Sequence, residues 1–536
     1  MAPGFVSFLL LCIGSIALLH LPRLFALVKK NPLPVSILLL FCVVGGLIRF
    51  QWVPNEHKIS FDEDRYLSYA VTFAKFGQAT NINLATPEKL MNGVPDSAGR
   101  VTVPVINAWI LKFFGYSEQA LFTGAKIASI LQILLIFMLG YLLTKKYIVA
   151  LIASFGIAFL PPVVFWSVST NLDLYFVSFA ILTLIASCWY GTKVTITSAL
   201  FLLSSIMLLL FVRFEGLLML PVVALLILCL RREQKHPLAT SKDLWFLITS
   251  VTFIGLRIFM SLSVFGKPWC CGEGTPLETF RIGHLIRNTL PNLKSLFFQP
   301  EFPAFITILA VIALIRNKKW YVSTLAVWGI LYFFLYSSYY AGKFFAHDFS
   351  GSYGRFFLML IPPLILLAGT AIEDLVLYGK KASLIHKVVL GVVAGISVLT
   401  LIPTIKQYKT MVSVSPYEWI VEASTRQFHK QLEDVFIAKT EPNAVLIHTL
   451  TSYTLLKGRT SVYIGSFIHD PATLDFVIDK LKKGIPVYMI ETDICPMKET
   501  CQEKLKYIEQ VRVLTDTYET YRIPIVQLKL KDMREP

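Results

Sequence analysis

The chain has 536 residues, of which 55% are hydrophobic and 16% are charged, and its formal net charge is +16. Soluble domains carry about 25% charged residues, so this composition, with a mean hydropathy of +0.63, excludes an ordinary soluble protein. The basic residues lie in short loops between apolar stretches, which favours a topological explanation of the charge over nucleic-acid binding. The sequence predicts a polytopic helical membrane protein with no nucleic-acid partner.

Apolar stretches long enough to cross a hydrocarbon core about 30 Å thick recur along roughly the first three quarters of the chain. We expect about twelve spans, at 4–22, 33–50, 118–143, 147–166, 173–191, 195–212, 217–230, 243–265, 302–315, 321–338, 356–374 and 387–403. The loops with Lys29/Lys30, Arg231/Arg232 and Lys380/Lys381 are among the alternate loops that the positive-inside rule assigns to the cytoplasm. The first outer loop, 51–117, and everything after residue 404 are then extracytoplasmic.

The composition changes near residue 404. Apolar runs at 444–447, 461–464 and 486–490 predict short buried strands, and amphipathic patterns at 472–483 and 498–510 predict helices. Alternating strands and helices are typical of a small α/β domain with a partly parallel sheet. We therefore expect an all-α membrane domain over 1–403 and a soluble extracytoplasmic α/β domain over 404–536.

An acidic run, Asp62-Glu63-Asp64, precedes Arg65 and Tyr66 in the first outer loop. In a helix, Asp62, Arg65 and Tyr66 share one face, whereas Glu63 lies off it. A partly desolvated carboxylate near the membrane boundary gains proton affinity, which suits a general base for transfer to a hydroxyl. Ser60 and Glu63 also fit a capping box, in which the acids only stabilise the helix N-terminus. Both interpretations stay open.

Two further acids are expected at the same membrane face. Asp173 lies where a span begins, and capping of that helix together with Thr170 or Asn171 is its simplest explanation. Glu215 follows Arg213 in another short turn, where a neutralising ion pair is the simplest explanation. Acids that different loops bring to one face would form a better catalytic candidate than either acid alone.

Basic residues on the outer face run against the positive-inside bias and need another explanation. Arg355, immediately before the span 356–374, is the strongest candidate, and Arg100 and Lys343 are further ones. A guanidinium binds phosphate through two parallel hydrogen bonds, although a residue that snorkels to the interface gives the same pattern. His347 beside Asp348 leaves a divalent metal ion open as a cofactor, without tight ligand spacing.

In this order, the motifs resemble the GT-C glycosyltransferases of the protein O-mannosyltransferase and aminoarabinose-transferase (ArnT-like) superfamily. The matching segments are 61–66, 103–118, 160–173, 213–218 and 353–362. The resemblance implies a GT-C membrane fold, Asp62 as the base with Glu63 in support, Asp173 as the acid of the second outer turn, and Arg355 as a donor-phosphate contact.

The resemblance also implies a polyprenyl-phosphate-linked sugar as donor and a glycan, lipid or protein as acceptor. We expect single inverting displacement at the extracytoplasmic face of a cell membrane, an inner membrane or the ER membrane. Further donor-phosphate contacts are expected at Arg100 and Lys343, and substrate contacts at Tyr66, Arg65, Glu215 and His347.

Two other classes of protein remain open. A transporter or flippase for a lipid-linked sugar would need ionisable residues within its spans and, commonly, repeated halves. The spans are strongly apolar, Arg257 being a rare internal charge, and no halves match. A non-catalytic subunit of a glycan-assembly complex would keep the fold without the chemistry.

Overall fold

The structure is a computed structural model, which describes residues 3–16, 31–58, 60–95, 100–237, 241–265, 281–299, 302–339, 354–379, 395, 402, 404–413, 436–438, 440–490, 508–514 and 525–530. The chain forms two compact units. The helical unit contains Met1–Lys58, Ser97–Thr102 and Phe122–Pro416. The α/β unit contains Ile59–Asp96, Val103–Leu121 and Tyr417–Pro536.

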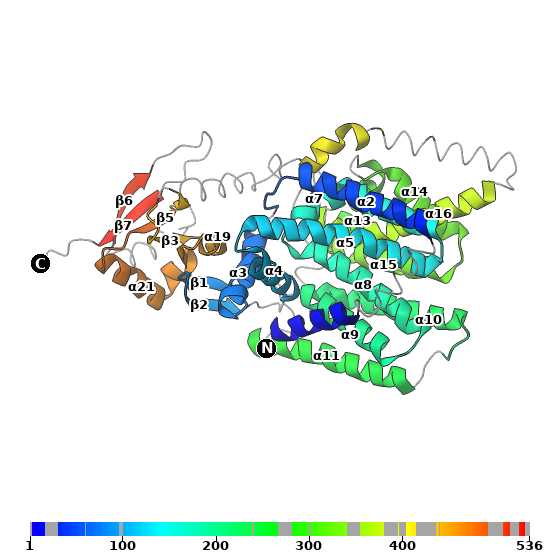
Figure 1. The fold of residues 1–536 in the computed structure, drawn as a ribbon, viewed down its shortest axis with the longest axis horizontal. Helices are drawn as coiled ribbons and strands as arrows, with labels where there is room; N and C mark the ends of the chain where they lie inside the picture. The colour runs from blue at the N-terminus through cyan, green and yellow to red at the C-terminus, as the bar shows by residue number, and fades with distance from the viewer. Residues whose placement is uncertain are drawn as a thin grey trace, which may run out of the picture. The chain divides into compact units, whose positions relative to one another are not determined.

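The helical unit is a bundle of apolar helices that run side by side (Figure 1). Its helices are α2 (Pro32–Gln51), α5 (Glu118–Thr144), α6 (Tyr147–Phe159), α7 (Pro161–Phe165), η1 (Trp166–Val168), α8 (Leu172–Thr192), α9 (Ile196–Val212), η2 (Phe214–Leu218), α10 (Met219–Glu233), α11 (Ser241–Phe265), α13 (Ile282–Phe298), α14 (Ala304–Arg316), α15 (Trp320–Ser337), η3 (Gly354–Met359) and α16 (Ile361–Gly379). α8 packs against α9 and α10, and α16 packs against α6 and α14.

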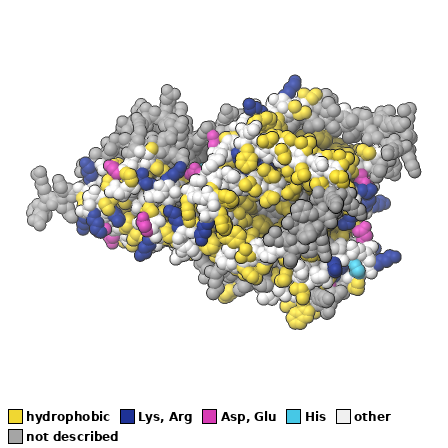
Figure 2. All heavy atoms as spheres, viewed as in Figure 1, with side chains coloured by type: hydrophobic (Ala, Val, Ile, Leu, Met, Phe, Trp, Pro, Cys, Tyr) yellow, Lys and Arg dark blue, Asp and Glu magenta, His cyan; other side chains and the backbone are white. Residues whose placement is uncertain are grey.

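Long apolar helices occur where the hydropathy pattern predicts them. Within the described residues, five helices are long and apolar enough to cross a membrane, or six if the bent pair of α6 with α7 and η1 is one span. Figure 2 shows a broad apolar surface over the helical unit, which suits contact with lipid. The chain is a multi-pass integral membrane protein, although the predicted total of twelve spans is not confirmed.

One predicted span, 147–166, is broken rather than continuous. α6 ends at Phe159, and the chain bends by 54° before Pro161–Val168. The physical reason is the pair Pro161-Pro162, because neither residue has a backbone N–H with which to continue the helix.

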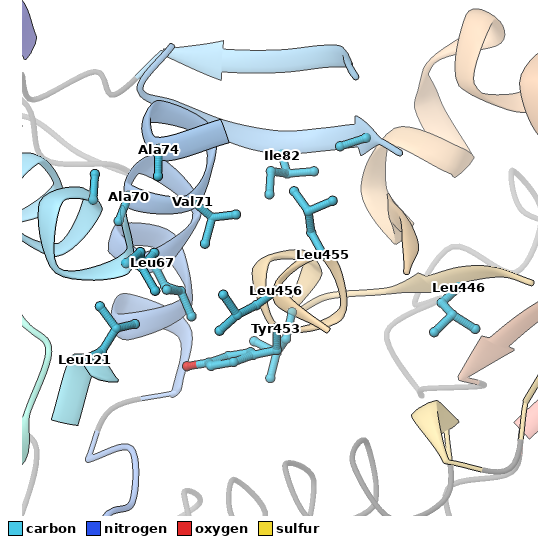
Figure 3. Close-up of a cluster of buried hydrophobic side chains, with 14 of the residues drawn as sticks. Leu67, Ala70, Val71, Ala74, Ile82, Leu121, Leu446, Tyr453, Leu455 and Leu456 are labelled. Atoms are coloured by element: carbon cyan, nitrogen blue, oxygen red, sulfur yellow. The ribbon is translucent and has the colours of Figure 1, made fainter. Parts of the chain in front are cut away.

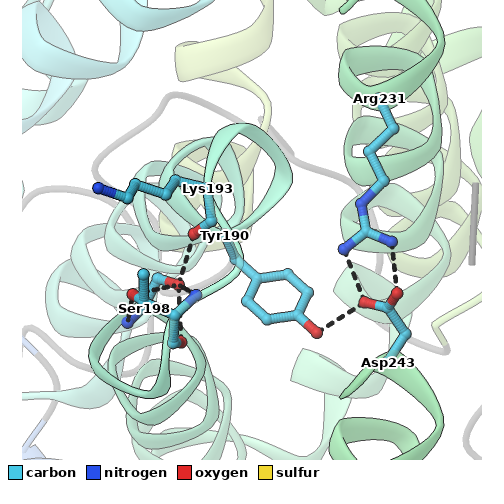
Figure 4. A network of polar contacts seen from close by, with 6 residues as sticks. Tyr190, Lys193, Ser198, Arg231 and Asp243 are labelled. Atoms are coloured by element: carbon cyan, nitrogen blue, oxygen red, sulfur yellow. Dashed lines mark hydrogen bonds and ion pairs between the residues drawn. The ribbon is translucent and has the colours of Figure 1, made fainter. Parts of the chain in front are cut away.

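Salt bridges and hydrogen bonds also join helix ends. At the end of α10, Arg231 forms a two-point contact with Asp243 of α11, with N···O distances of 2.7 and 2.6 Å. Tyr190 of α8 donates its hydroxyl hydrogen to Asp243 at 2.7 Å, so one carboxylate holds three helices (Figure 4). Since Arg231 is buried, this pairing offsets the cost of removing its charge from water.

The α/β unit is built on a seven-stranded mixed sheet with the order β2-β1-β4-β3-β5-β7-β6. β3 is parallel to β4 and β5, whereas the other pairings are antiparallel. Its elements are α3 (Ser60–Phe76), β1 (Thr80–Ala85), β2 (Leu90–Pro95), α4 (Thr102–Phe114), β3 (Val445–His448), α19 (Thr451–Leu456), β4 (Thr460–Tyr463), α20 (Ile464–His469), α21 (Pro471–Lys482), β5 (Val487–Ile490), β6 (Ile508–Leu514) and β7 (Ile525–Leu530).

The predicted first outer loop, 51–117, supplies β1 and β2, so strands from both sides of the predicted boundary at residue 404 belong to one sheet. β1 pairs with β4 in the register Leu84↔Val462 and Ala85↔Ser461. Figure 3 shows side chains of α3, such as Leu67 and Val71, gathered with Leu455 and Leu456 of α19 in one buried cluster. Burial of this shared apolar surface holds the two distant segments in one unit.

The C-terminal elements follow the prediction except at one place. The strands predicted near 444, 461 and 486 and the helix predicted over 472–483 are present as β3, β4, β5 and α21. The helix predicted over 498–510 is wrong at its end, because residues 508–510 begin β6, which pairs with β7. Residues 508–510 are extended because they pair with β7, and such pairing with another segment cannot be detected from the periodicity of the local sequence. The earlier part of that prediction lies outside the described residues.

We expect the α/β unit to lose stability in mild acid because of His448. Its Nδ1 accepts the Leu450 N–H at 3.0 Å, its Nε2 lies 2.9 Å from Thr454 Oγ1, and burial lowers its pKa to about 3. The stabilisation from the neutral ring is complete above the unfolded pKa of about 6.5 and is lost as pH falls toward the folded value, by about 2 kcal/mol at pH 5. Hydrogen exchange of residues 445–456, corrected for the intrinsic effect of pH, should become faster in the wild type as pH falls toward about 5. The acceleration should be much smaller in His448→Asn. Equal acid sensitivity in the two proteins would contradict it.

Candidate functional site

Asp173 lies in the first turn of α8, but another residue caps that helix. Asn171 Oδ1 accepts the Leu172 N–H at 2.6 Å, so the predicted capping by Asn171 is confirmed. The Asp173 side chain is only 7% exposed and lies 2.7 Å from the Arg213 guanidinium, measured from Oδ1 to Nη2. The carboxylate therefore has an electrostatic partner from a different helix end.

Arg213 connects two acids. It is the C-cap of α9, and its Nη1 lies 3.5 Å from Glu215 Oε1 in η2, so the predicted ion pair between these residues is present but long. The Glu215 backbone carbonyl accepts a hydrogen bond of 3.0 Å from the Tyr332 hydroxyl of α15. Arg213 is thus placed by a turn that is itself fixed to the bundle.

Arg355 approaches the same carboxylate from η3. Its Nε lies 3.6 Å from Asp173 Oδ2, which is within ion-pair range but beyond a hydrogen bond. The guanidinium carbons of Arg355 and Arg213 lie 5.2 and 5.4 Å from the centre of the Phe356 ring, on which Tyr336 stacks at 4.8 Å. We name Asp173, Arg213, Glu215 and Arg355 the arginine–carboxylate cluster.

The cluster concentrates charge inside a membrane protein. The side chains of Arg213 and Arg355 are each 11% exposed. Charges at such depth are costly unless they are paired, and in membrane proteins they commonly mark a functional site. Two arginines around a shared carboxylate can bind an anion if one of them exchanges its contact, and Arg355 has the longer of the two contacts with Asp173.

Polar atoms beside Asp173 add hydrogen-bonding capacity. Thr170 Oγ1, Asn171 Nδ2 and Tyr175 Oη are buried, and none has a hydrogen-bond partner within the described part of the chain. Buried polar groups are nearly always hydrogen-bonded to protein, water or ligand. These atoms therefore suit water or a hydroxylated ligand near the start of α8.

The acidic run of the first outer loop forms the start of α3 in the α/β unit. Asp62 is partly exposed, whereas Glu63 and Asp64 are buried, in line with the predicted separation of Asp62 from Glu63. Arg65 Nε donates to the Tyr69 hydroxyl at 2.8 Å, and the Tyr66 ring is buried with its centre 6.4 Å from that of Tyr69. The predicted capping box cannot be compared, because the Ser60 side chain lies outside the described residues.

Asp64, for which the sequence indicates no function, joins α3 to α19. Its Oδ1 accepts hydrogen bonds from the Ser452 hydroxyl and, at 3.3 Å, from the Ser452 N–H. The Ser452 hydroxyl also lies 3.2 Å from the Asp64 carbonyl oxygen. This is a structural contact within the α/β unit.

We expect Ser452→Ala to destabilise this contact. The variant removes a donor from the buried Asp64 carboxylate, which costs about 1–3 kcal/mol. Hydrogen exchange of the α3 and α19 peptides should accelerate, whereas Ser413→Ala, which changes an exposed hydroxyl of the helical unit, should leave it unchanged. Unaltered protection of both peptides in Ser452→Ala would contradict a structural role of this contact.

The remaining candidates are dispersed. Arg100 is partly exposed in the segment Ser97–Thr102 of the helical unit, and Lys343 and His347 lie outside the described residues. Within the part of the chain that is described, no three His, Cys, Asp or Glu side chains gather as a metal site requires. The structure brings together Asp173, Glu215 and Arg355, while Asp62, Glu63, Arg65 and Tyr66 share α3.

Sequence reasoning missed how central Arg213 is and did not find the aromatic partners Tyr336 and Phe356. Arg213 was visible as a charged residue between apolar spans, directly after α9. The stacking of Tyr336 on Phe356 had no sequence signal, since aromatic residues are frequent throughout the spans.

Comparison with known proteins identifies a fold. No protein-family model matches the sequence, and no curated protein matches it. Among solved structures, ArnT from Cupriavidus metallidurans bound to undecaprenyl phosphate is similar, with a TM-score of 0.57 and 13% identity over 95% of this chain and 99% of that chain. ArnT in the apo state gives a TM-score of 0.58 and 13% identity over 92% and 97% of the two chains.

The archaeal oligosaccharyltransferase AglB from Archaeoglobus fulgidus is more distant, with a TM-score of 0.46 and 13% identity over 95% of this chain and 75% of that chain. The two ArnT structures cover nearly the whole chain, so the resemblance noted in the sequence extends to the fold. The protein has the ArnT-like fold of the GT-C glycosyltransferases.

Proposed function

We propose that the protein is a membrane glycosyltransferase that moves a monosaccharide from a polyprenyl-phosphate donor to an acceptor hydroxyl on the extracytoplasmic side. The observation that carries this proposal is the arginine–carboxylate cluster, in which Arg213 and Arg355, each only 11% exposed, lie beside the buried Asp173. A buried guanidinium suits the phosphate of a lipid that itself lies in the membrane. The ArnT structure of the same fold is bound to undecaprenyl phosphate, which supports this choice of donor.

In the proposed reaction, the acceptor oxygen attacks the anomeric carbon as the bond from that carbon to the phosphate oxygen breaks. The acceptor proton passes to the Asp62 carboxylate, with Glu63 in support, and the polyprenyl phosphate leaves with the bonding electron pair. Arg355 stabilises the charge that develops on the phosphate, which lowers the barrier more than it stabilises the bound donor. One displacement of this kind inverts the anomeric configuration.

The other proposed contacts divide between donor and sugar. Asp173 positions Arg355, and the buried polar atoms of Thr170, Asn171 and Tyr175 suit sugar hydroxyls. Further donor-phosphate contacts are proposed for Arg100 and Lys343, and substrate contacts for Arg65, Tyr66, Glu215 and His347. We also retain 1–403 as the proposed membrane domain and 404–536 as the proposed extracytoplasmic domain, with β1 and β2 of the first outer loop added to its sheet.

The proposal is tested with purified protein in liposomes that contain a polyprenyl-phosphate-linked sugar labelled in the sugar. Transfer of label to an added acceptor mixture, with release of polyprenyl phosphate, is the expected result. Translocation of intact donor without transfer would instead support a flippase. Neither transfer nor translocation, across a panel of lipid-linked sugars and with glycan, lipid and peptide acceptors, would favour the non-catalytic subunit.

A further inference from the structure

Arg49 is a fully buried arginine in the apolar helix α2, outside the arginine–carboxylate cluster. Its Nε donates to Ser129 Oγ of α5 at 2.8 Å, and its Nη1 donates to the Gly45 carbonyl at 2.9 Å. The remaining two hydrogen bonds go to the end of α6. Nη1 donates to the Ala158 carbonyl and Nη2 to the Ile157 carbonyl, each at 2.8 Å.

The two α6 carbonyls are those that the proline pair leaves without a helical partner. In an α-helix the N–H of residue i bonds to the carbonyl of residue i−4, so residues 161 and 162 would serve Ile157 and Ala158. Both positions are proline, which has no N–H. The flanking bonds belong to the two separate helices: Leu160 N–H bonds to Gly156 at 2.9 Å at the end of α6, and Val164 N–H bonds to Leu160 at 3.1 Å at the start of α7.

The guanidinium fits this end of α6 in charge and in space. A helix C-terminus carries partial negative charge, which favours a cation there. α2 approaches α6 closely at Gly45, where an added Cβ would lie 3.3 Å from the Ala158 Cβ and from Arg49 Nη1. A side chain at position 45 would push these groups apart.

The bend leads into the arginine–carboxylate cluster. Every residue from Leu160 to Asp173 is buried, so the segment has little freedom to shift independently of its surroundings. α7 and α8 both contact η3, the turn that contains Arg355. A change of direction at Pro161 would therefore move Asp173 relative to Arg355.

We propose that Arg49 is a positioning residue for the cluster: its guanidinium replaces the two N–H donors that Pro161 and Pro162 lack and so fixes the bend between α6 and α7. Within a bilayer, water is not available to hydrogen-bond a free backbone carbonyl, so donation from the guanidinium to these two carbonyls is strongly favoured. The effect of Arg49 on donor binding rests on the proposed function, whereas its effect on the bend does not.

The test combines two measurements on full-length protein in detergent. Arg49→Met should raise the dissociation constant for undecaprenyl phosphate at least about tenfold, because Asp173 and Arg355 lose their alignment. Arg49→Lys should fall between Met and the wild type, since an ammonium lacks the planar fork. Ser129→Ala is the matched control: it removes the partner of Nε, leaves both α6 contacts in place and should stay within about twofold of the wild type.

The second measurement is a double-mutant cycle in thermal stability. Pro161→Ala with Pro162→Ala restores both N–H donors, so Arg49→Met should lower the melting temperature less in that background than in the wild type. Should Arg49→Met not be recovered folded, Arg49→Lys completes both measurements.

Two results would overturn the proposal. One is an equal loss of melting temperature with and without the prolines, which would show that the guanidinium does not replace their donors. The other is wild-type binding of undecaprenyl phosphate by Arg49→Met and Arg49→Lys when Arg355→Ala binds weakly. If the wild type does not bind undecaprenyl phosphate, the proposed function fails. The double-mutant cycle in melting temperature then decides by itself whether Arg49 fixes the bend.

Discussion

Arg355→Ala is expected to lower kcat/KM for a polyprenyl-phosphate sugar by about 100-fold or more. Under the proposed function, the variant removes a charge-assisted, two-point phosphate contact in a site of low dielectric constant, which corresponds to about 3 kcal/mol. It should fold, because Asp173 keeps its 2.7 Å contact with Arg213. Arg355→Lys keeps the charge without the fork and should lose less activity. Initial rates over a range of donor concentrations measure both.

Arg287→Ala is a suitable control for Arg355→Ala. Arg287 is an exposed arginine on α13, outside the arginine–carboxylate cluster, and its loss should change kcat/KM by less than about twofold. Arg213→Ala should differ from both variants by destabilising the protein, because it removes the closer cation from the buried Asp173 carboxylate and the ion-pair partner of the partly exposed Glu215. Full activity of folded Arg355→Ala would exclude Arg355 as a donor-phosphate contact.

Asp62→Asn is expected to lower kcat by about 10²–10⁴-fold while the affinity for undecaprenyl phosphate stays unchanged. The substitution keeps the shape of the side chain and removes its ability to accept the acceptor proton. Asp62 is partly exposed at the start of α3, so the uncharged amide of Asp62→Asn can still be hydrated. The fold should therefore persist. Single-turnover transfer together with equilibrium binding separates the chemical step from donor binding.

Asp64→Asn is the matched control, two residues further along α3. It weakens the buried contact with Ser452 and should therefore lower stability, while kcat of the folded fraction stays within about threefold of the wild type. Full activity of Asp62→Asn would show that Asp62 is not the base.

The helices could be predicted from sequence because hydropathy over a span is a local property. The predictions over 33–50, 118–143 and 173–191 correspond closely to α2, α5 and α8. The break in 147–166 is encoded by Pro161-Pro162, but its stabilisation by Arg49 depends on the approach of α2 at Gly45. Such contacts between distant segments have no periodic signal.

The same distinction applies to the candidate site and to the sheet. Asp173, Glu215 and Arg355 could be selected because charges are rare beside apolar spans, whereas their meeting around Arg213 is set by the packing of α8, α9 and η3. β1 is a short strand of three polar and three apolar residues, so nothing local indicated that it pairs with β4. Its partner follows more than 300 residues later, and only the tertiary fold brings the two together.

A structure of the protein with undecaprenyl phosphate bound gives the decisive comparison for the arginine–carboxylate cluster. We expect a phosphate oxygen about 3 Å from the Arg355 guanidinium, with the Arg213–Asp173 contact retained. A phosphate bound away from Arg355 and Arg213, for instance at the basic loop after α10, would contradict the proposed donor site.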